Sequence, residues 1–309
     1  MTKDWTMIVN PASASGTMAE KWKVYERQLL EGGLQVAPSL TLRQGHAMEL
    51  AMAAAAAGCR KIIVAGGDGT LHEVMTGLLR WCDAEKADMG AFTIAMLPSG
   101  TGNDWIRTAG VPNDDGAVNC ILAGHTARED VVRLTFENGT FCMANVGGIG
   151  LDADICYYTN NLKKKGRKGG ILYKLVAPYS IYAKKCRPVE IVCDDTPFFK
   201  GKIYSVIIGN GLFRGGGVRQ NEPGARWDDG WLEVTVMPAV SPSKAVYQMY
   251  HALKGDFVTL PGIVSHRFRR MTVTPLEGEP DRVESDGELP GTLPVTVELT
   301  GQQIQIIVP

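Results

Sequence analysis

The sequence predicts two domains, an N-terminal α/β domain built on a parallel sheet and a C-terminal domain of mainly antiparallel β-structure. A chain of 309 residues is too long for one ordinary hydrophobic core. Strand patterns alternate with helical patterns up to about residue 130, and short strand patterns separated by turn residues then take over. We therefore expect a first domain at residues 1–130, joined by about residues 300–309, and a second at residues 131–299.

The stretch Lys61–Cys82 shows the α/β pattern most clearly. Its apolar run Ile62–Ala65 suits a strand that is covered on both faces. Apolar residues then recur at the spacing of a helix, at Leu71, Val74, Met75, Leu78 and Leu79. Between them, Gly66–Thr70 form a turn whose glycines let backbone N–H groups approach an anion at the start of a helix. A phosphate ligand is the first hypothesis, and a tight turn without a ligand is the alternative.

The remaining elements of the α/β domain follow in chain order. They are a strand at Trp5–Val9 with the loop Asn10–Gly16, a helix at Met18–Glu31, a strand at Leu34–Thr41, a helix at Ala47–Ala57, and a strand at Thr93–Leu97 with the loop Pro98–Asp104. Strands that alternate with helices imply right-handed crossovers, so the loops that follow the strands lie at one edge of the sheet. We expect the loops that carry Asn10, Thr41, Asp68 and Thr101 to gather there.

The second domain begins with a clear hairpin, Val131–Asn145, whose tip is Asn138-Gly139. Further strands are predicted at Val189–Cys193, Lys202–Gly209, Leu232–Met237, Met271–Thr274, Val295–Leu299 and Ile304–Val308, with one helix at Ser243–Leu253. The join between the domains, near Ala127–Asp130, is short. We expect the domains to share a fixed cleft.

Composition and charge restrict the partners and the compartment. The net charge is -1, which gives no electrostatic reason to expect nucleic acid as the main partner. The first strand pattern begins too early for a signal peptide, and no apolar run is long enough to span a bilayer, so a cytoplasmic location is expected. The seven cysteines are scattered without zinc-ligand spacing and are interpreted as reduced thiols. An exposed edge strand in the β domain would allow a homodimer.

Short motifs occur in a fixed order along nearly the whole chain. They are Asn10-Pro11, Thr41 with Gly45-His46-Ala47, Gly66-Gly67-Asp68-Gly69-Thr70, Gly100-Thr101 with Asn103-Asp104, Asn145 with Gly148 and Gly150–Ala153, Asn210-Gly211, Gly215-Gly216-Gly217, Asp229-Gly230 and Asp286-Gly287-Glu288. Together they resemble the diacylglycerol kinase catalytic domain, and the bacterial soluble lipid kinases related to it in particular. The resemblance implies an N-terminal domain like that of NAD kinase and phosphofructokinase and a C-terminal β-sandwich.

The activity implied by this resemblance is a cytoplasmic lipid kinase of phospholipid biosynthesis. ATP and Mg²⁺ would lie in the cleft between the domains, and the γ-phosphoryl group would pass to the hydroxyl of diacylglycerol or a related lipid, which the enzyme reaches at the membrane surface. Two alternatives stay open, an NAD kinase with the same glycine turn and a catalytically silent lipid-binding relative. The Asp286-Gly287-Glu288 motif and the other C-terminal matches favour the lipid kinase.

The expected site combines backbone amides, hydroxyls and carboxylates, because the chain has no P-loop motif. The expected nucleotide-binding residues are Asn10, Pro11, Ser13, Thr41, Gly66, Gly67, Asp68, Gly69, Thr70, Leu71, His72, Glu73, Gly100, Thr101 and Asn103. Asp68 is also a candidate catalytic or metal-binding acid, since an acid between phosphate-binding glycines requires a cation or serves the acceptor hydroxyl. The resemblance assigns the catalytic base to the pair Asp286 and Glu288. It also implies a structural Mg²⁺ at Asp229 with carbonyls of Arg226 and Trp231, and Asp104 is expected to stabilise its loop or a metal–water network.

Four features depart from this pattern or compete with it. The first loop has Ala12, Ser13 and Ala14 where the family has glycines nearer its Asn-Pro, and His72 replaces an Asn of many bacterial relatives, so the lipid is not assumed to be diacylglycerol. Residues Gly148–Ala153 satisfy G-x-G-x-x-A, but they lie outside the α/β half and predict no dinucleotide site. The basic run Lys163–Lys168 is interpreted as a solvated loop, with a membrane contact as the alternative.

Overall fold

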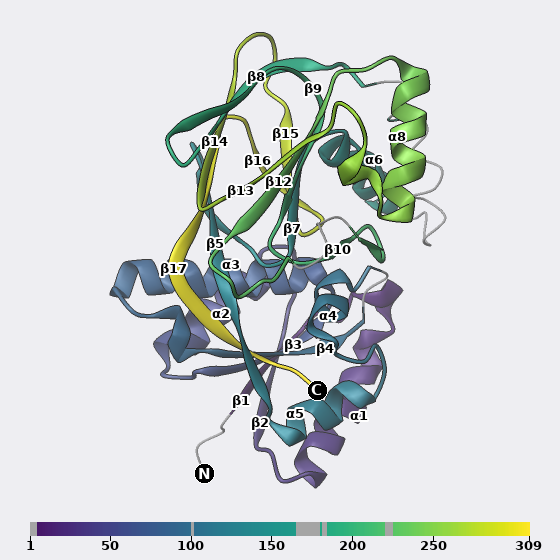
Figure 1. Ribbon diagram of the computed structural model, residues 1–309. Coiled ribbons are helices and arrows are strands. Elements are labelled where there is room, and N and C mark those ends of the chain that lie inside the picture. The colour runs from purple at the N-terminus through teal and green to yellow at the C-terminus, as the bar shows by residue number, and fades with distance from the viewer. Residues whose placement is uncertain (1–4, 100–101, 165–179, 181–183, 220–224) are drawn as a thin grey trace. The chain divides into compact units, whose positions relative to one another are not determined.

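The computed structural model describes residues 5–99, 102–164, 180, 184–219 and 225–309. The chain divides into two compact units, residues 1–131 with 300–309, and residues 132–299. Two long strands, β5 (Thr126–Phe136) and β17 (Val295–Ile307), begin in one unit and end in the other (Figure 1). Each unit is described separately below.

The first unit is an α/β domain with a parallel sheet, as the sequence predicts. Its elements are β1 (Trp5–Val9), η1 (Ala14–Gly16), α1 (Met18–Glu31), β2 (Val36–Leu40), α2 (His46–Ala56), β3 (Lys61–Gly66), α3 (Asp68–Glu85), η2 (Met89–Ala91), β4 (Thr93–Pro98), α4 (Asp104–Ala109) and α5 (Gly116–Ala123). The strand order is β2-β1-β3-β4, and the last residues of β17 add a fifth parallel strand beside β4.

Helices cover both faces of this sheet (Figure 1). On one face α2 packs closely against α3, and a Cβ atom added to Gly77 of α3 would lie only 2.4 Å from the Met48 backbone oxygen of α2. Only glycine allows this approach, and the alanine-rich sequence of α2 keeps the opposing surface small. On the other face α1 packs against α5. The crossovers place the carboxyl ends of the strands at one edge.

The second unit is built mainly from antiparallel strands. Its elements are β6 (Gly139–Met143), β7 (Val146–Gly150), α6 (Leu151–Lys164), β8 (Arg187–Cys193), β9 (Thr196–Gly209), β10 (Phe213–Arg214), β11 (Val218–Arg219), β12 (Leu232–Pro238), α8 (Pro242–Lys254), η3 (Phe257–Thr259), β13 (Val264–Phe268), β14 (Arg270–Pro275), β15 (Arg282–Ser285) and β16 (Glu288–Thr292). The long strand β9 pairs with β8, β7 and β12. A core of buried aliphatic side chains from these strands holds the unit together, and a smaller apolar cluster lies beneath α6 and α8.

The structure differs from the predicted elements at several points. The two strands expected at Val295–Leu299 and Ile304–Val308 are one strand, β17, in which Gly301 has φ 76° and permits the irregular backbone. The segment Gly148–Ala153 contains the end of β7 and the start of α6, an element that the sequence reading did not predict. Because β7 pairs antiparallel with β9 and β15, this strand–helix junction does not form a dinucleotide-binding βαβ unit.

The cysteines and the hydropathy of the helices were the subject of two further expectations. All seven cysteines are free, and burial raises the pKa of the Cys82 thiol to about 11 and that of Cys193 to about 12, as expected for structural thiols. Over the ranges that the structure describes, no helix combines the length and the hydropathy needed to cross a membrane.

Candidate functional site

Hydrogen bonds tie together the loops that follow the strands of the first unit. The Asn10 side-chain Nδ2, after β1, donates to the Thr70 hydroxyl in α3 at 3.0 Å. The Ser13 and Ser99 hydroxyl oxygens are 2.6 Å apart, which joins the loop after β1 to the loop after β4. The backbone N–H of Thr41, after β2, donates to the Val9 carbonyl at 2.8 Å. These loops therefore gather at one sheet edge, as predicted.

The glycine turn places the first residues of α3 at this edge. Gly67 is extended, with φ -106° and ψ -173°, and α3 begins at Asp68. A Cβ atom on Gly66 would lie 2.5 Å from the Thr70 hydroxyl oxygen, so the close packing of Thr70 requires glycine at this position. The first turn of a long helix presents backbone N–H groups and the positive end of its dipole. This arrangement favours an anionic ligand.

Asp68 connects the glycine turn to the start of α4. Its two carboxylate oxygens accept the backbone N–H groups of Asp104 and Trp105, each at 3.3 Å. A Cβ atom on Gly102 would lie 3.1 Å from Asp68 Oδ2 and 3.5 Å from Asp104 Oδ2, so the two carboxylates flank this glycine. Arg107 donates to Asp104 Oδ1 at 2.9 Å. The half-buried Asp68 carboxylate thus lies beside a second acid.

Four predicted nucleotide-binding residues of α3 are hydrogen-bonded to neighbouring loops or buried in the fold. Both carboxylate oxygens of Glu73 accept backbone N–H groups at the start of α2, from Gly45 at 2.7 Å and from Ala47 at 3.0 Å. Thr70 accepts the bond from Asn10, and Leu71 and His72 are buried at 1% and 4% exposure. These contacts position the loops, and a direct role of the four side chains in nucleotide binding stays a prediction.

The remaining predicted nucleotide-binding residues at this sheet edge differ in their burial and contacts. Pro11 and Thr41 are half-buried. Asn103 is buried, adopts a left-handed backbone with φ 51°, and donates to Asn113 Oδ1 at 2.7 Å. Gly100 and Thr101 lie outside the described residues. The Asn103 side chain therefore links the loop before α4 to the segment between α4 and α5.

Asp286 of the second unit fastens a tight turn between β15 and β16. It has φ 51° and the following Gly287 has φ 86°, the two left-handed residues of a two-residue hairpin turn. Its carboxylate accepts three backbone N–H groups, from Ala144 at 2.9 Å, Asn145 at 2.8 Å and Val146 at 3.1 Å. The side chain is buried. Asp286 therefore connects this turn to the segment between β6 and β7.

A second buried acid, Glu284, supports the same turn. One of its carboxyl oxygens accepts the Gly287 backbone N–H at 2.6 Å. Burial raises the pKa of the Glu284 carboxyl to about 8, and the Asp286 and Asp152 charges act in the same direction, whereas the Gly287 hydrogen bond and Arg214 oppose them. A Cβ atom on Gly148 would lie 3.2 Å from Glu284 Oε2, so glycine at this position admits the buried carboxyl. The neutral acid stabilises the turn next to Glu288, the first residue of β16, which is half-buried.

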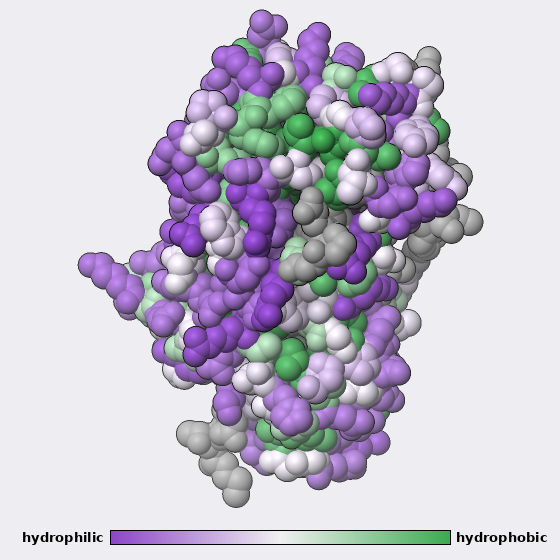
Figure 2. Space-filling model, viewed as in Figure 1, coloured by the Kyte–Doolittle hydropathy of each residue, from purple (hydrophilic) through white to green (hydrophobic). Residues whose placement is uncertain are grey.

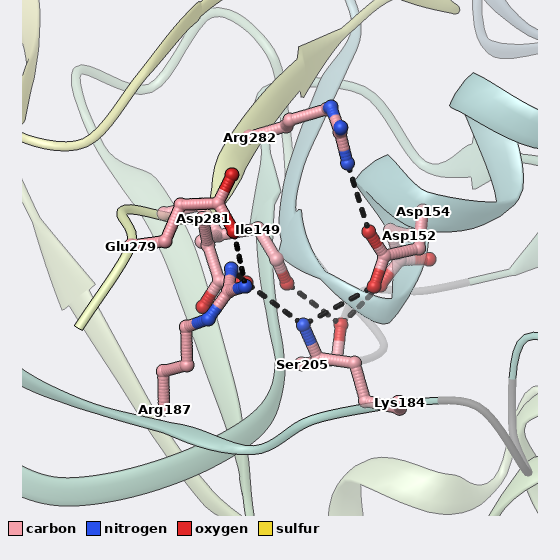
Figure 3. Close-up of polar contacts among 9 residues, drawn as sticks. All are labelled: Ile149, Asp152, Asp154, Lys184, Arg187, Ser205, Glu279, Asp281 and Arg282. Atoms are coloured by element: carbon pink, nitrogen blue, oxygen red, sulfur yellow. Dashed lines mark hydrogen bonds and ion pairs between the residues drawn. The ribbon is translucent and has the colours of Figure 1, made fainter.

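Ionic contacts around the start of α6 continue from this turn (Figure 3). The Asp152 carboxylate accepts the Ser205 hydroxyl and pairs with Arg214 at 2.5 Å. The buried Lys184 ammonium lies between Asp154 at 3.2 Å and Asp281 at 2.9 Å, as the close-up shows. Each buried charge thus has an opposite charge beside it, which offsets the cost of burial. The network fixes α6 against β9 and β15.

The Asp229 carboxylate makes two contacts within the second unit, and the structural Mg²⁺ with the Arg226 and Trp231 carbonyls stays a prediction. One carboxylate oxygen of Asp229 accepts the Trp231 N–H at 3.1 Å, and the other pairs with Arg267. The Arg226 side chain pairs with Asp228 at 2.7 Å, a contact that does not involve the backbone carbonyl predicted as a ligand. Over the residues that the structure describes, no group of three or more His, Cys, Asp or Glu side chains could hold a metal ion, and a site of one carboxylate and two backbone carbonyls is of a different kind.

Comparison with known proteins identifies the family. Residues 4–134 match the family described as the diacylglycerol kinase catalytic domain, and residues 145–308 match the YegS C-terminal domain, described as NAD kinase β-sandwich-like. The chain belongs to the diacylglycerol kinase family. The first match ends in β5, and the second begins at Asn145, whose N–H donates to Asp286.

Relatives of this diacylglycerol kinase family member align over about three quarters of the chain or more. A diacylglycerol kinase from Staphylococcus carnosus is 25% identical and aligns over 100% of this chain and 96% of its own. A YegS-like lipid kinase from Pseudomonas aeruginosa is 31% identical over 77% of this chain and 74% of its own. A solved structure of a diacylglycerol kinase from Bacillus anthracis covers 99% of this chain and 97% of its own, with 25% identity and a TM-score of 0.77. An NAD kinase from Archaeoglobus fulgidus, solved with ATP, has 13% identity over 98% of this chain and 93% of its own and a TM-score of 0.51, which shows a shared fold alone.

Sequence reasoning missed two residues of this family member's second unit. Glu284 precedes the recognised motif by two residues, and nothing in its local sequence shows that strand pairing with Gly148 buries it. Lys184 is fixed by acids from two distant segments. The feature that could have indicated Glu284 is a charged residue within a short strand, between Val283 and Ser285, that is buried on both sides.

Proposed function

We propose that this chain is an ATP- and Mg²⁺-dependent lipid kinase that phosphorylates the hydroxyl of diacylglycerol or a related lipid alcohol. The observation that supports it best is the glycine turn at the start of α3, whose Asp68 lies beside Asp104 in a chain of the diacylglycerol kinase family. The helix start is suited to phosphate oxygens, and the two acids to a nucleotide-bound cation.

The residues at this edge fit a nucleotide with its Mg²⁺. Mg²⁺ keeps several waters and is bound through one or two carboxylates together with substrate phosphates, and Asp68 and Asp104 supply two carboxylates that flank one glycine. Bound there, the ion would neutralise phosphate charge. The chain's own contribution is positioning, because the hydrogen bonds among the strand-end loops fix the donors before the nucleotide arrives.

Transfer forms one bond and breaks one. The lipid hydroxyl oxygen attacks the γ-phosphorus, the bond from this phosphorus to the bridging oxygen of ADP breaks, and the hydroxyl proton passes to a base. We assign this base to Glu288, because the Asp286 carboxylate already accepts three backbone N–H groups whereas Glu288 begins a strand at a half-buried position.

A product analysis tests the proposal. Purified protein is incubated with ATP, Mg²⁺ and either a cellular lipid extract, single lipid alcohols or NAD, and phosphorylated products are identified by mass spectrometry. Turnover of a lipid alcohol is the expected result. Phosphorylation of NAD alone would make the chain an NAD kinase, and lipid binding without turnover of any acceptor would make it a silent relative.

A further inference from the structure

Trp105 and Glu129 form a buried pair in the first unit. The Trp105 indole Nε1–H donates to both carboxylate oxygens of Glu129, at 3.1 Å and 3.0 Å. Each residue is only 1% exposed. Charged side chains are rarely buried to this degree, and hydrophilic residues cover much of the face of the molecule shown in Figure 2. A buried acid near the start of β5 therefore needs a physical reason.

The indole N–H group alone does not require a carboxylate. A backbone carbonyl or a neutral amide oxygen would satisfy it, and a carboxylate costs more free energy to bury than either of these. A charged acceptor makes the stronger hydrogen bond, and here both oxygens of one carboxylate share the donor. The pair therefore restrains the Trp105 side chain more firmly than packing alone would.

The Trp105 backbone carries this restraint to Asp68. Its N–H group donates to Asp68 Oδ1 at 3.3 Å, and the N–H group of the preceding Asp104 donates to Oδ2 at 3.3 Å. Both groups lie in the first turn of α4, a helix of six residues. A helix of this length has little stability of its own, so buried side chains fix its place. The position of the Trp105 indole therefore determines where the two N–H groups meet the Asp68 carboxylate.

Other side chains of α4 restrain the helix in different ways. Ile106 is buried at 2% exposure, but its side chain is apolar and makes no directional contact. Arg107 pairs with Asp104 at 2.9 Å from a side chain that is 40% exposed, where water weakens an ion pair. The contact between Trp105 and Glu129 is both buried and directional, so it is the one suited to hold the first turn.

We propose that Glu129 is a positioning residue for Asp68, on which it acts through the Trp105 indole and the first turn of α4. The inference rests on the proposed function, in which Asp68 and Asp104 receive a nucleotide-bound Mg²⁺. Glu129 keeps the two N–H groups where they orient the Asp68 carboxylate toward the cation. Loss of the pair should therefore raise the Mg²⁺ requirement of the protein.

Three substitutions measure this effect. Trp105→Phe keeps an aromatic ring but removes the indole N–H, and Glu129→Leu removes the acceptor. Each should raise the Mg²⁺ concentration needed for half-maximal ADP binding roughly tenfold, the scale of one hydrogen bond to a charged group. Glu129→Gln retains an oxygen that accepts the indole N–H and should stay within about threefold. Calorimetric titration with ADP at a series of Mg²⁺ concentrations measures all three without any lipid.

The double variant Trp105→Phe with Glu129→Leu tests whether the two residues act through one contact. It should require no more Mg²⁺ than the worse of the two single variants, because a lost contact cannot be lost twice. Effects that multiply in the double variant would show that Glu129 does not act through Trp105.

Trp5→Phe is the matched control. Trp5 is a buried tryptophan of the same unit, at 4% exposure, and it begins β1 at the end of the strand opposite to the Asn10 loop. Its substitution should lower the urea midpoint through lost packing but leave the Mg²⁺ requirement unchanged. A raised requirement in Trp5→Phe would overturn the inference. An unchanged requirement in both Trp105→Phe and Glu129→Leu would do the same.

Hydrogen exchange gives a second readout that needs neither nucleotide nor metal. Without Mg²⁺, the N–H groups of Asp104 and Trp105 should exchange faster in Trp105→Phe and Glu129→Leu than in Trp5→Phe or the unchanged protein, because the first turn of α4 opens more readily. Mass spectrometry of the peptide that contains α4 measures this exchange. Equal exchange in all four proteins would show that the pair does not fix the first turn.

A kinase assay separates this inference from the proposed function. Its acceptor is a short-chain diacylglycerol dissolved as monomers, so that a membrane contact plays no part. The membrane contact considered for Lys163–Lys168 falls on residues whose side chains lie outside the described part of the chain.

Each result of the kinase assay assigns a distinct outcome. If the unchanged protein binds ADP with Mg²⁺ but phosphorylates no lipid, and Trp105→Phe and Glu129→Leu still need more Mg²⁺, the positioning role stands and the proposed kinase fails. If both variants phosphorylate lipid at the normal Mg²⁺ requirement, the kinase stands and the positioning role fails. An unchanged protein that shows no Mg²⁺-dependent ADP binding would overturn both.

Discussion

Asp68 and Asp286 are each the first residue of an Asp-Gly pair, one in each unit, and their structural surroundings differ. Both precede a glycine and both accept backbone N–H groups. Asp68 begins a helix in ordinary helical backbone, is half-buried, and accepts two long hydrogen bonds of 3.3 Å. Asp286 adopts a left-handed backbone, is buried, and accepts three shorter ones. An Asp-Gly pair thus begins a helix in one unit and holds a hairpin turn in the other.

The largest expected effect is on folding, at Asp286. Asp286→Ala removes the acceptor of three buried N–H groups, and each unsatisfied group costs free energy, so the free energy of unfolding should fall by at least about 3 kcal/mol. Urea denaturation followed by circular dichroism measures this. Asp286→Asn keeps the shape but places an amide donor against N–H groups and should also destabilise. If turnover were lost with an unchanged urea midpoint, Asp286 would be the catalytic base rather than a fastening.

The next effect is on turnover, at Asp68 and Glu288. Asp68→Asn and Glu288→Gln should each lower the lipid kinase rate at least about 10²-fold, the scale for loss of an acid–base or metal-positioning group. Their unfolding midpoints should stay close to that of the unchanged protein. Glu20→Gln, at an exposed carboxyl of α1, is the control and should change neither quantity. Rates near normal in both variants would refute the assignment.

A pH effect on stability should follow from Glu284. The pKa of this carboxyl is about 8 in the fold against an ordinary value of 4.5, so the folded chain binds more protons than the unfolded chain between these values. The Glu284 contribution to stability is therefore fully present below about pH 4.5, declines as pH rises, and is lost above about pH 8, at up to about 1.4 kcal/mol per pH unit.

Glu284→Gln is the matched variant for this prediction. Its amide oxygen can still accept the Gly287 N–H, and it has no charge to bury. Urea titrations at pH 5 and pH 8, compared between the two proteins, should show a smaller loss on raising the pH in the variant. Parallel losses in both would mean that Glu284 does not titrate in this range.

The smallest effect concerns the first loop, where two residues other than glycine adopt a left-handed backbone. Ala14 and Ser15 have φ 48° and 61°, in the segment where the diacylglycerol kinase family places glycines. Asp286 offsets the same conformation with three side-chain hydrogen bonds, whereas Ala14 has no polar side-chain atom and only its carbonyl accepts, from the Thr17 N–H and hydroxyl. Ala14→Gly should raise the free energy of unfolding by up to about 1 kcal/mol, because the left-handed conformation disfavours a Cβ atom. A lower thermal midpoint than that of the unchanged protein would contradict this.

The sequence predicts those features that local patterns determine. The helix Met18–Glu31 has the predicted bounds, and the glycine turn lies between the predicted strand and helix. The sequence of helix α6 also has a helical pattern. Leu151, Ile155, Tyr158 and Leu162 recur at helical spacing and pack on one apolar cluster.

The site contacts depend on residues far apart in the chain and were not predictable in the same way. Glu73 accepts N–H groups from residues 26 and 28 positions away, and Asp286 from residues 140 to 142 positions away. The periodicity of apolar residues predicts helices and strands, but it does not predict hydrogen bonds between residues so far apart in the chain. These acids connect distant segments through hydrogen bonds to backbone N–H groups. Only the structure shows this role, because the fold brings the partners together.

The path of β17 has a consequence for synthesis of the protein. Its residues Gln305 and Ile306 pair with Thr93 and Ile94 of β4, which completes the sheet of the first unit. All of the second unit is translated between β4 and this last strand. The N-terminal unit therefore cannot finish folding on the ribosome before the C-terminal unit has been made, and a nascent chain stalled at residue 299 would expose the edge of β4.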